Sequence, residues 1–193
     1  MKILFLVFSF VFVIQSFAQN NILQHLKKRN TKDDSSFVYS LPYEKEKSHF
    51  LVQAYMSIFS HKGEYALDFK MKKGTKICAA RNGICVAIKE DSKKGGIGGK
   101  FLSEGNHVII KHIDGTYANY WHLQFEGALV NVGDTIQRGQ VIALSGNTGY
   151  TAFPHLHFEV TTQFTPGNNQ IPTRFSTKKG IRYLRPLHCY KSI

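Results

Sequence analysis

The sequence predicts an all-β protein whose core is an antiparallel sheet. From Phe37 onward, short segments rich in aromatic or β-branched residues recur, and most are separated by Gly, Asn, Asp or Pro. Such segments are typical of strands bounded by turns. No stretch in this part of the chain repeats its apolar residues over a long helical period. The expected strands span residues 37–39, 50–52, 76–78, 84–88, 107–111, 117–121, 141–144 and 153–159.

The first 18 residues predict a cleavable signal peptide. A basic start at Lys2 precedes an apolar run over residues 3–14, and small residues follow at Ser16 and Ala18. The run is shorter than the roughly 20 apolar residues that span a bilayer. We therefore expect cleavage after Ala18 and export to the periplasm or the cell exterior, with an uncleaved membrane anchor as the alternative. No later segment could span a membrane, so we expect no stable span after cleavage.

The remaining chain predicts a polar lead followed by one domain. Residues 19–36 offer few apolar side chains and are expected to be a short helix or disordered. Residues 37–193 are long enough for a single domain with a sizeable core, and they include a C-terminal extension.

The chain is strongly basic, with 25 Lys and Arg against 13 Asp and Glu and a net charge of +12. Such an excess favours an anionic partner. The lysines are scattered and no nucleic-acid-binding motif is visible, so we expect no nucleic acid partner. For an exported protein the anionic cell envelope is the better candidate, although the charge could serve solubility alone.

The cysteine pattern argues against a cysteine-based metal site. Cys78 and Cys85 flank the turn signal Arg81-Asn82-Gly83, which leaves open a disulfide between adjoining strands, and Cys189 stands apart. The chain has no C-x-x-C pair of the kind that binds metals.

Two histidines one residue apart form the most informative segment, Phe153-Pro154-His155-Leu156-His157-Phe158-Glu159. Alternate residues of a strand share a face, so His155 and His157 should project together while Leu156 and Phe158 turn to the core. Imidazole is the commonest metal ligand among side chains. Taken alone, the pair is equally well explained by a half-exposed strand with two polar residues.

Other residues are candidates for the rest of a hydrolytic zinc site, which needs three protein ligands, a free position for water and a group that handles protons. His61 opens a segment that runs through Ala66-Leu67-Asp68-Phe69, and His122 lies in Tyr120-Trp121-His122-Leu123. Each of these is a weak signal by itself.

Two glycine-rich loops accompany these residues. The loop over residues 91–106 carries Lys93, Lys94 and Lys100 among five glycines and suits a mobile, cationic segment. The turn Ser145-Gly146-Asn147-Thr148-Gly149 precedes the strand with the two histidines, either as a plain connection or as part of a groove.

In combination and order, these motifs resemble the lysostaphin-like (LytM-type) zinc metallo-endopeptidases, which cut peptides in bacterial peptidoglycan. The shared motifs are the His-to-Asp segment, the aromatic-x-His-Leu, Ser-Gly-Asn-Thr-Gly, Pro-His-Leu-His-Phe-Glu and a Gly-Asp-x-Ile-x-x-Gly-Gln-x-Ile run at residues 133–142. The resemblance covers residues 39–160. It implies a barrel-sandwich-hybrid-like topology with an open groove, and peptidoglycan as the substrate and partner.

Residue by residue, the resemblance makes His61, Asp68 and His157 the ligands of one Zn²⁺ per chain. It places His122 and His155 beside the metal as catalytic residues, where one acts as general base and the pair stabilises the oxyanion. The commoner family spacing is H-x-x-x-D, whereas six residues separate His61 from Asp68 here, so Glu64 is kept as a substitute ligand.

Three alternatives accompany this interpretation. A non-catalytic peptidoglycan-binding regulator of other wall hydrolases would lack some ligands, yet every expected position is filled. Lipoyl and biotinyl carriers share the run at 133–142, with Lys70-Met71 as the only counterpart of their modified lysine. A lead segment folded over the groove could bring His25 to the metal.

Overall fold

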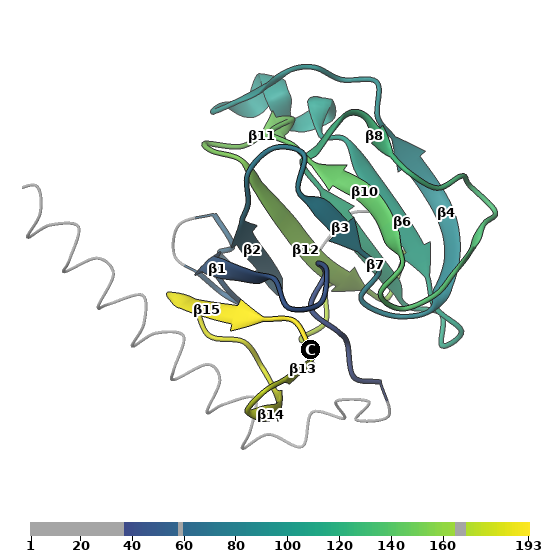
Figure 1. Cartoon of the computed structure of the whole chain (residues 1–193). Helices are drawn as coiled ribbons and strands as arrows, with labels where there is room; N and C mark the ends of the chain where they lie inside the picture. Colours follow the sequence, from purple (N-terminus) through teal and green to yellow (C-terminus); the bar gives the residue numbers. More distant parts are fainter. Residues whose placement is uncertain (1–36, 58–59, 165–168) are drawn as a thin grey trace, which may run out of the picture.

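The computed structural model describes residues 37–57, 60–164 and 169–193 (Figure 1). The expected signal peptide at 1–18, the lead at 19–36 and His25 lie outside the described residues. No helix within the described ranges is long and apolar enough to cross a membrane.

The largest element is an eight-stranded antiparallel sheet in the order β15-β1-β2-β12-β7-β6-β4-β9. The strand bounds, in sheet order, are His188–Lys191, Ser48–Gln53, Ala66–Lys70, His155–Thr161, Tyr117–Trp121, His107–Lys111, Gly83–Lys89 and Thr135–Ile136. This architecture confirms the all-β prediction.

Smaller sheets complete the fold. β3 (Lys76–Cys78), β10 (Val141–Ser145) and β8 (Leu123–Ala128) form a three-stranded sheet, which lies across the larger one in Figure 1. β5 (Gly95–Gly96) pairs with β11 (Gly149–Tyr150), next to the 3₁₀ helix η1 (Gly99–Glu104). β13 (Phe175–Thr177) and β14 (Gly180–Arg182) form a hairpin.

The core fills the space between the two larger sheets. Ile77 and Ile142 of the small sheet are fully buried in one cluster with Tyr120 and Phe158 of the large sheet. The rings of Tyr120 and Phe158 meet edge to face with centroids 5.2 Å apart, an arrangement that aromatic pairs prefer. Leu156 and Phe158 have no exposed surface, as the alternation of their strand predicts.

Most expected strands are confirmed, and the differences include both ends of the domain. Residues 37–39 do not form a strand, because Tyr39 makes only an isolated bridge to Phe175. The C-terminal strands β13 to β15 were not predicted; β15 adds to the sheet edge beside β1, with Ser48 opposite Lys191. β2 and β8 were likewise not predicted as strands.

The three thiols are free. Cys78 lies in the small sheet and Cys85 in the large one, and both are buried, whereas Cys189 is exposed. Burial raises the pKa of Cys78 to about 11. The disulfide left open by the sequence is therefore not formed, and the buried thiols stay protonated at neutral pH.

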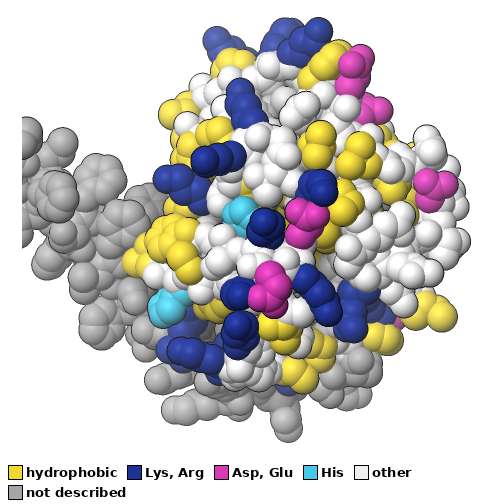
Figure 2. Space-filling view, in the orientation of Figure 1, with side chains coloured by type: hydrophobic (Ala, Val, Ile, Leu, Met, Phe, Trp, Pro, Cys, Tyr) yellow, Lys and Arg dark blue, Asp and Glu magenta, His cyan; other side chains and the backbone are white. Residues whose placement is uncertain are grey.

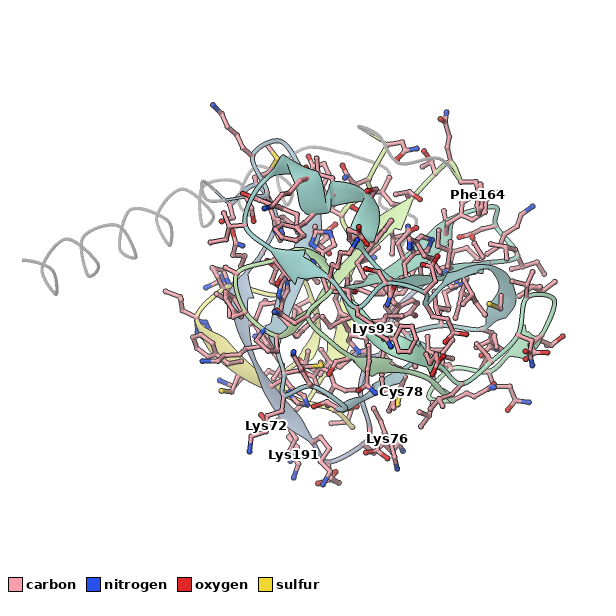
Figure 3. All side chains as sticks on the ribbon, turned by 90° about the horizontal axis from the view of Figure 1, so that it is seen from above. Lys72, Lys76, Cys78, Lys93, Phe164 and Lys191 are labelled. Carbon is pink, nitrogen blue, oxygen red and sulfur yellow. The ribbon has the colours of Figure 1, made fainter. Side chains whose placement is uncertain are left out.

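Lys and Arg side chains outnumber Asp and Glu on the face seen in Figure 2 and lie in several groups across it. Lys72, Lys76 and Lys191 project outward on one side of the molecule (Figure 3). Lys76 Nζ lies 3.1 Å from Glu44 Oε1, and Lys191 pairs with Glu46. Lys72 is exposed as well, and Lys45, Lys47 and Lys73, close to these residues in the sequence, are also exposed and add positive charge to the surface.

His112 makes the fold sensitive to acid. Its ring is 2% exposed, its Nδ1 donates to Asn82 O at 2.7 Å, and burial lowers its pKa to about 4. In the unfolded chain the ring takes up a proton near pH 6.5, so its contribution to stability is complete above that pH. This contribution is lost as the pH falls from about 6.5 to about 4, which lowers the free energy of unfolding by up to about 3 kcal/mol.

As the pH falls from about 6.5 to about 4, we expect the free energy of unfolding of the metal-free protein to decrease less in His112→Phe than in the wild type. Phenylalanine keeps a ring at this position but cannot titrate. Urea unfolding at several pH values measures the slope for both proteins. An identical pH slope in both would show that His112 is not buried as a neutral ring.

Candidate active site

A groove of about 740 Å³ crosses the face of the large sheet at β1, β2, β12 and β7. All five sequence-predicted site residues line it. Strands of the sheet add further lining residues, and the segments around this end of the sheet contribute Ile97, Leu102, Gly105, Tyr150 and Phe153.

The three predicted ligands lie together, with both histidines close to one carboxylate oxygen of Asp68. Asp68 Oδ1 lies 3.2 Å from His61 Nε2 and 3.0 Å from His157 Nδ1. One ligand atom from each of the three residues lies within 4.8 Å of the other two. Glu64 lines the groove but is not part of this cluster.

Strand register produces this convergence. β2 and β12 pair so that His157 stands opposite Asp68, and β7 on the other side of β12 places Trp121 opposite His157. Directly opposite residues of antiparallel strands project from the same face. His61 reaches the same point from the connection between β1 and β2.

His155 and His122 lie next to the cluster. His155 is 6% exposed, shares the face of His157, and its Nε2 is 3.6 Å from Asp68 Oδ1. His122 follows β7 with a positive φ of 63°. Its ring centroid is 4.6 Å from that of His155 and 5.8 Å from that of His157.

Backbone carbonyls fix the tautomers of His122 and His155. His122 Nδ1 lies 2.7 Å from Thr148 O, and His155 Nδ1 lies 2.8 Å from Phe153 O. A carbonyl only accepts hydrogen bonds, so each Nδ1 carries a proton and donates it. The lone pair of each neutral ring is therefore on Nε2.

The Ser-Gly-Asn-Thr-Gly turn is more than a connection, because it supplies this anchor for His122. A Cβ added at Gly149, whose φ is +81°, would lie 2.7 Å from Gly105 Cα and 3.4 Å from His122 Nδ1. Only glycine fits at this close approach of two loops.

Burial and charge give the site a neutral pair, His122 and His155, and an ionic pair, Asp68 and His157. Burial, together with His155 and His157, lowers the pKa of His122 to about 3, and burial also lowers the pKa of His155. Both rings are neutral at physiological pH. This keeps the Nε2 lone pairs free to accept protons.

The other pair is ionic. Burial raises the pKa of Asp68, but the histidines around it, His61 and His155 first, outweigh burial and hold the pKa well below its usual range. Burial lowers the pKa of His157, but the Asp68 and Glu159 carboxylates outweigh it and raise this pKa to about 10. A buried anion thus faces a cation in the metal-free site.

The donor set fits a zinc ion. Two imidazole nitrogens and one carboxylate oxygen are ligands that Zn²⁺ takes, and three protein ligands leave a fourth position for water or substrate. Asp68 is 3% exposed, and its oxygen lies at the meeting point of the three residues. A bound cation would neutralise this buried charge.

Three polar residues of the site were not predicted from the sequence. Glu159 Oε2 lies 3.8 Å from His157 Nε2 and accepts a hydrogen bond of 3.0 Å from Gln170 Nε2. Gln53 Nε2 donates to Asp68 Oδ2 at 2.8 Å. The alternation of β12 places Glu159 on the same strand face as His157, so the sequence contained a signal for this residue. No sequence pattern indicated Gln53 or Gln170.

The loop over residues 91–106, expected to be mobile and cationic, contributes apolar side chains to the groove. It contains β5 and η1, and it presents Ile97 and Leu102 to the groove rather than its lysines. Lys93 Nζ lies 4.1 Å from the centroid of the Phe125 ring, and Lys94 Nζ lies 3.3 Å from Glu104 Oε1. This wall of the groove is therefore apolar.

Known proteins named as endopeptidases are similar in sequence to this chain. The chain is 33% identical over 117 residues to the glycyl-glycine endopeptidase ALE-1 of Staphylococcus capitis, covering 60% of this chain and 30% of that protein. It is 44% identical over 99 residues to the peptidoglycan DD-endopeptidase ShyB of Vibrio cholerae, covering 51% of this chain and 20% of that protein. The chain thus spans less than a third of the length of these relatives.

A solved structure shares the fold. A variant of the catalytic domain of the prophage-encoded M23 protein EnpA from Enterococcus faecalis superimposes with a TM-score of 0.52 at 22% identity, covering 71% of this chain and 95% of that chain. The profile of peptidase family M23 matches residues 61–170, more than half of the chain, from the first predicted ligand to beyond β12. The chain belongs to peptidase family M23.

Proposed function

We propose that this chain is an exported zinc-dependent endopeptidase that hydrolyses peptide bonds in the cross-links or stems of bacterial peptidoglycan. One observation carries the proposal: a metal-type cluster and two neutral histidines, each with a free Nε2, share one groove. The relatives named glycyl-glycine endopeptidase and peptidoglycan DD-endopeptidase support the reaction and the substrate class.

In this proposal His61 Nε2, Asp68 Oδ1 and His157 Nδ1 hold one Zn²⁺ per chain. When bound, the ion acts as a Lewis acid and lowers the pKa of a coordinated water to about 7. Asp68 brings the negative charge of the ligand set. Glu159, near His157 Nε2, helps to fix the orientation of that ring, as carboxylates commonly do for metal-binding histidines.

His122 and His155 move protons. A neutral ring with its lone pair on Nε2 accepts a proton from the attacking water, and the imidazolium so formed returns it to the leaving amine. The protonated ring can also donate to the developing oxyanion. The carbonyls of Thr148 and Phe153 keep both Nε2 atoms directed at the groove throughout.

The groove and the surface suit a peptidoglycan peptide. Ile97 and Leu102 are 73% and 68% exposed along one wall, where they can cover the methyl groups of alanine residues. The positive charge of the surface favours approach to the carboxylates of the wall polymer. Export would follow from the signal peptide expected at residues 1–18.

We expect the full chain with zinc to release fragments with new amine ends from purified peptidoglycan, detected by mass spectrometry, and a chelator to prevent this. His122→Ala and His155→Ala should each lower the rate by a factor of about 10² or more, because general acid–base catalysis contributes 10²–10⁴. Both variants should retain zinc.

His188→Gln, on the exposed edge strand β15, is the control and should cleave at the wild-type rate. If wild-type protein bound peptidoglycan without cutting it, the regulator hypothesis would replace this proposal. Cleavage that persisted in both histidine variants would remove them from the mechanism.

Asp68 is expected to control the charge of His157. In metal-free Asp68→Asn the pKa of His157 should fall from about 10 toward its ordinary value, because the largest favourable interaction with the imidazolium is gone. Glu159→Gln should lower it less. Histidine NMR titration measures both, and zinc content should fall strongly in Asp68→Asn. Stoichiometric zinc with an unchanged pKa would contradict the ligand assignment.

A further inference from the structure

Gln53 is a buried amide at the end of β1, directly opposite Asp68 in the sheet register and 9% exposed. It lines the groove. Its side chain reaches the groove from the strand next to β2, and it has no role in the proton transfers proposed above.

All four hydrogen-bonding positions of the Gln53 amide are filled. Nε2 donates to Asp68 Oδ2 and to Ser60 Oγ, each at 2.8 Å. Oε1 accepts from Ser57 Oγ at 2.8 Å and from Ser60 N at 3.3 Å. An amide has two donors and one oxygen with two lone pairs, so none is left unused. Turning the amide over would place Oε1 against the Asp68 carboxylate, and its orientation is therefore fixed.

This arrangement gives the two carboxylate oxygens of Asp68 different partners. Oδ1 faces His61 and His157, while Oδ2 receives the amide proton of Gln53. A carboxylate held in this way cannot rotate about its Cβ–Cγ bond without losing a buried hydrogen bond to a charged group, which is stronger than one between neutral groups. Oδ1 is thus kept toward the other two ligands.

The same amide also holds the segment that leads to His61. Ser60 immediately precedes His61 and bonds to Gln53 through both its main-chain N–H and its hydroxyl. Six residues separate His61 from Asp68 along the chain, so the turn between them does not by itself fix their relative position. Gln53, on the neighbouring strand, links the two through its hydrogen bonds to Ser60 and Asp68.

We propose that Gln53 is a positioning residue of the metal centre, which holds Asp68 directly and His61 through Ser60 in the arrangement that binds the ion. The inference rests on the proposed function for the identity of the metal. It does not depend on which bond is cut, because its consequence is the affinity for zinc itself.

The test compares Gln53→Met, which keeps the length of the side chain but cannot donate, with the wild-type full chain. Zn²⁺ affinity is measured by competition with a chromophoric chelator, and the melting temperature of each metal-free protein is measured in parallel. We expect Gln53→Met to bind Zn²⁺ about 10- to 100-fold more weakly, the usual effect of removing a partner of a metal ligand.

A matched control is Thr177→Val in the β13–β14 hairpin. It removes the side-chain hydrogen bonds of another buried residue, from Thr177 Oγ1 to Gly180 O at 2.7 Å and from Lys179 N to Thr177 Oγ1 at 3.2 Å, at residues that do not line the groove. We expect lower stability in this variant with wild-type Zn²⁺ affinity. If Gln53→Met does not fold, Gln53→Glu replaces it, because its carboxylate would repel Asp68 and should weaken Zn²⁺ binding at least as much.

Wild-type Zn²⁺ affinity in the folded Gln53 variant would overturn the proposal, as would an equal loss of affinity in Thr177→Val. A wild-type chain that binds Zn²⁺ but leaves peptidoglycan uncut would overturn the proposed function. Weakened Zn²⁺ binding in the Gln53 variant would then still support the positioning role.

Discussion

A buried carboxylate organises this protein. Asp68 is 3% exposed in the middle of the large sheet, and an isolated charge there would cost several kcal/mol. Nitrogen atoms of His61, His155 and His157 lie within 3.6 Å of its Oδ1. In the metal-free protein the proton on His157 compensates the charge. A divalent cation between the same atoms would do so more completely, which is why this cluster is better explained as a binding site than as core packing.

The sheet and the loops contribute differently to the site. Asp68, His155 and His157 stand on paired strands, so backbone hydrogen bonds set their spacing. His61 and His122 come from loops and need additional anchors, which Ser60 and Thr148 provide. The positive φ of His122 costs roughly 1 kcal/mol or more for a residue with a Cβ. The hydrogen bond to Thr148 O holds the ring in place despite this strain.

The sequence predicted those parts of the site that have a local pattern. The alternation around Leu156 placed His155 and His157 on one face, and the resemblance to the endopeptidase family pointed to Asp68 and His122. β2 was not predicted because four of its five residues, Ala66 to Phe69, are buried on both faces and show no alternation. Gln53 was not predicted because its role depends on the register of β1 against β2, which no local pattern encodes.

The apolar side chains that the loop over residues 91–106 adds to the groove were not predicted, for a related reason. Composition shows that Lys93 and Lys94 are present, but not which direction they point; one packs on Phe125 and the other pairs with Glu104, while Ile97 and Leu102 reach the groove. Lys93 contacts β8 of the small sheet and Lys94 contacts η1, so these directions depend on tertiary structure and not on composition.

The most direct measurement is a crystal structure of the full chain with Zn²⁺, using anomalous scattering at the zinc absorption edge to locate the ion. We expect one zinc bonded to His61 Nε2, Asp68 Oδ1 and His157 Nδ1, with the Nε2 atoms of His122 and His155 facing it but not bonded. A zinc bonded to His155 or Glu64, or to Asp68 through Oδ2, would contradict the assignment of the site.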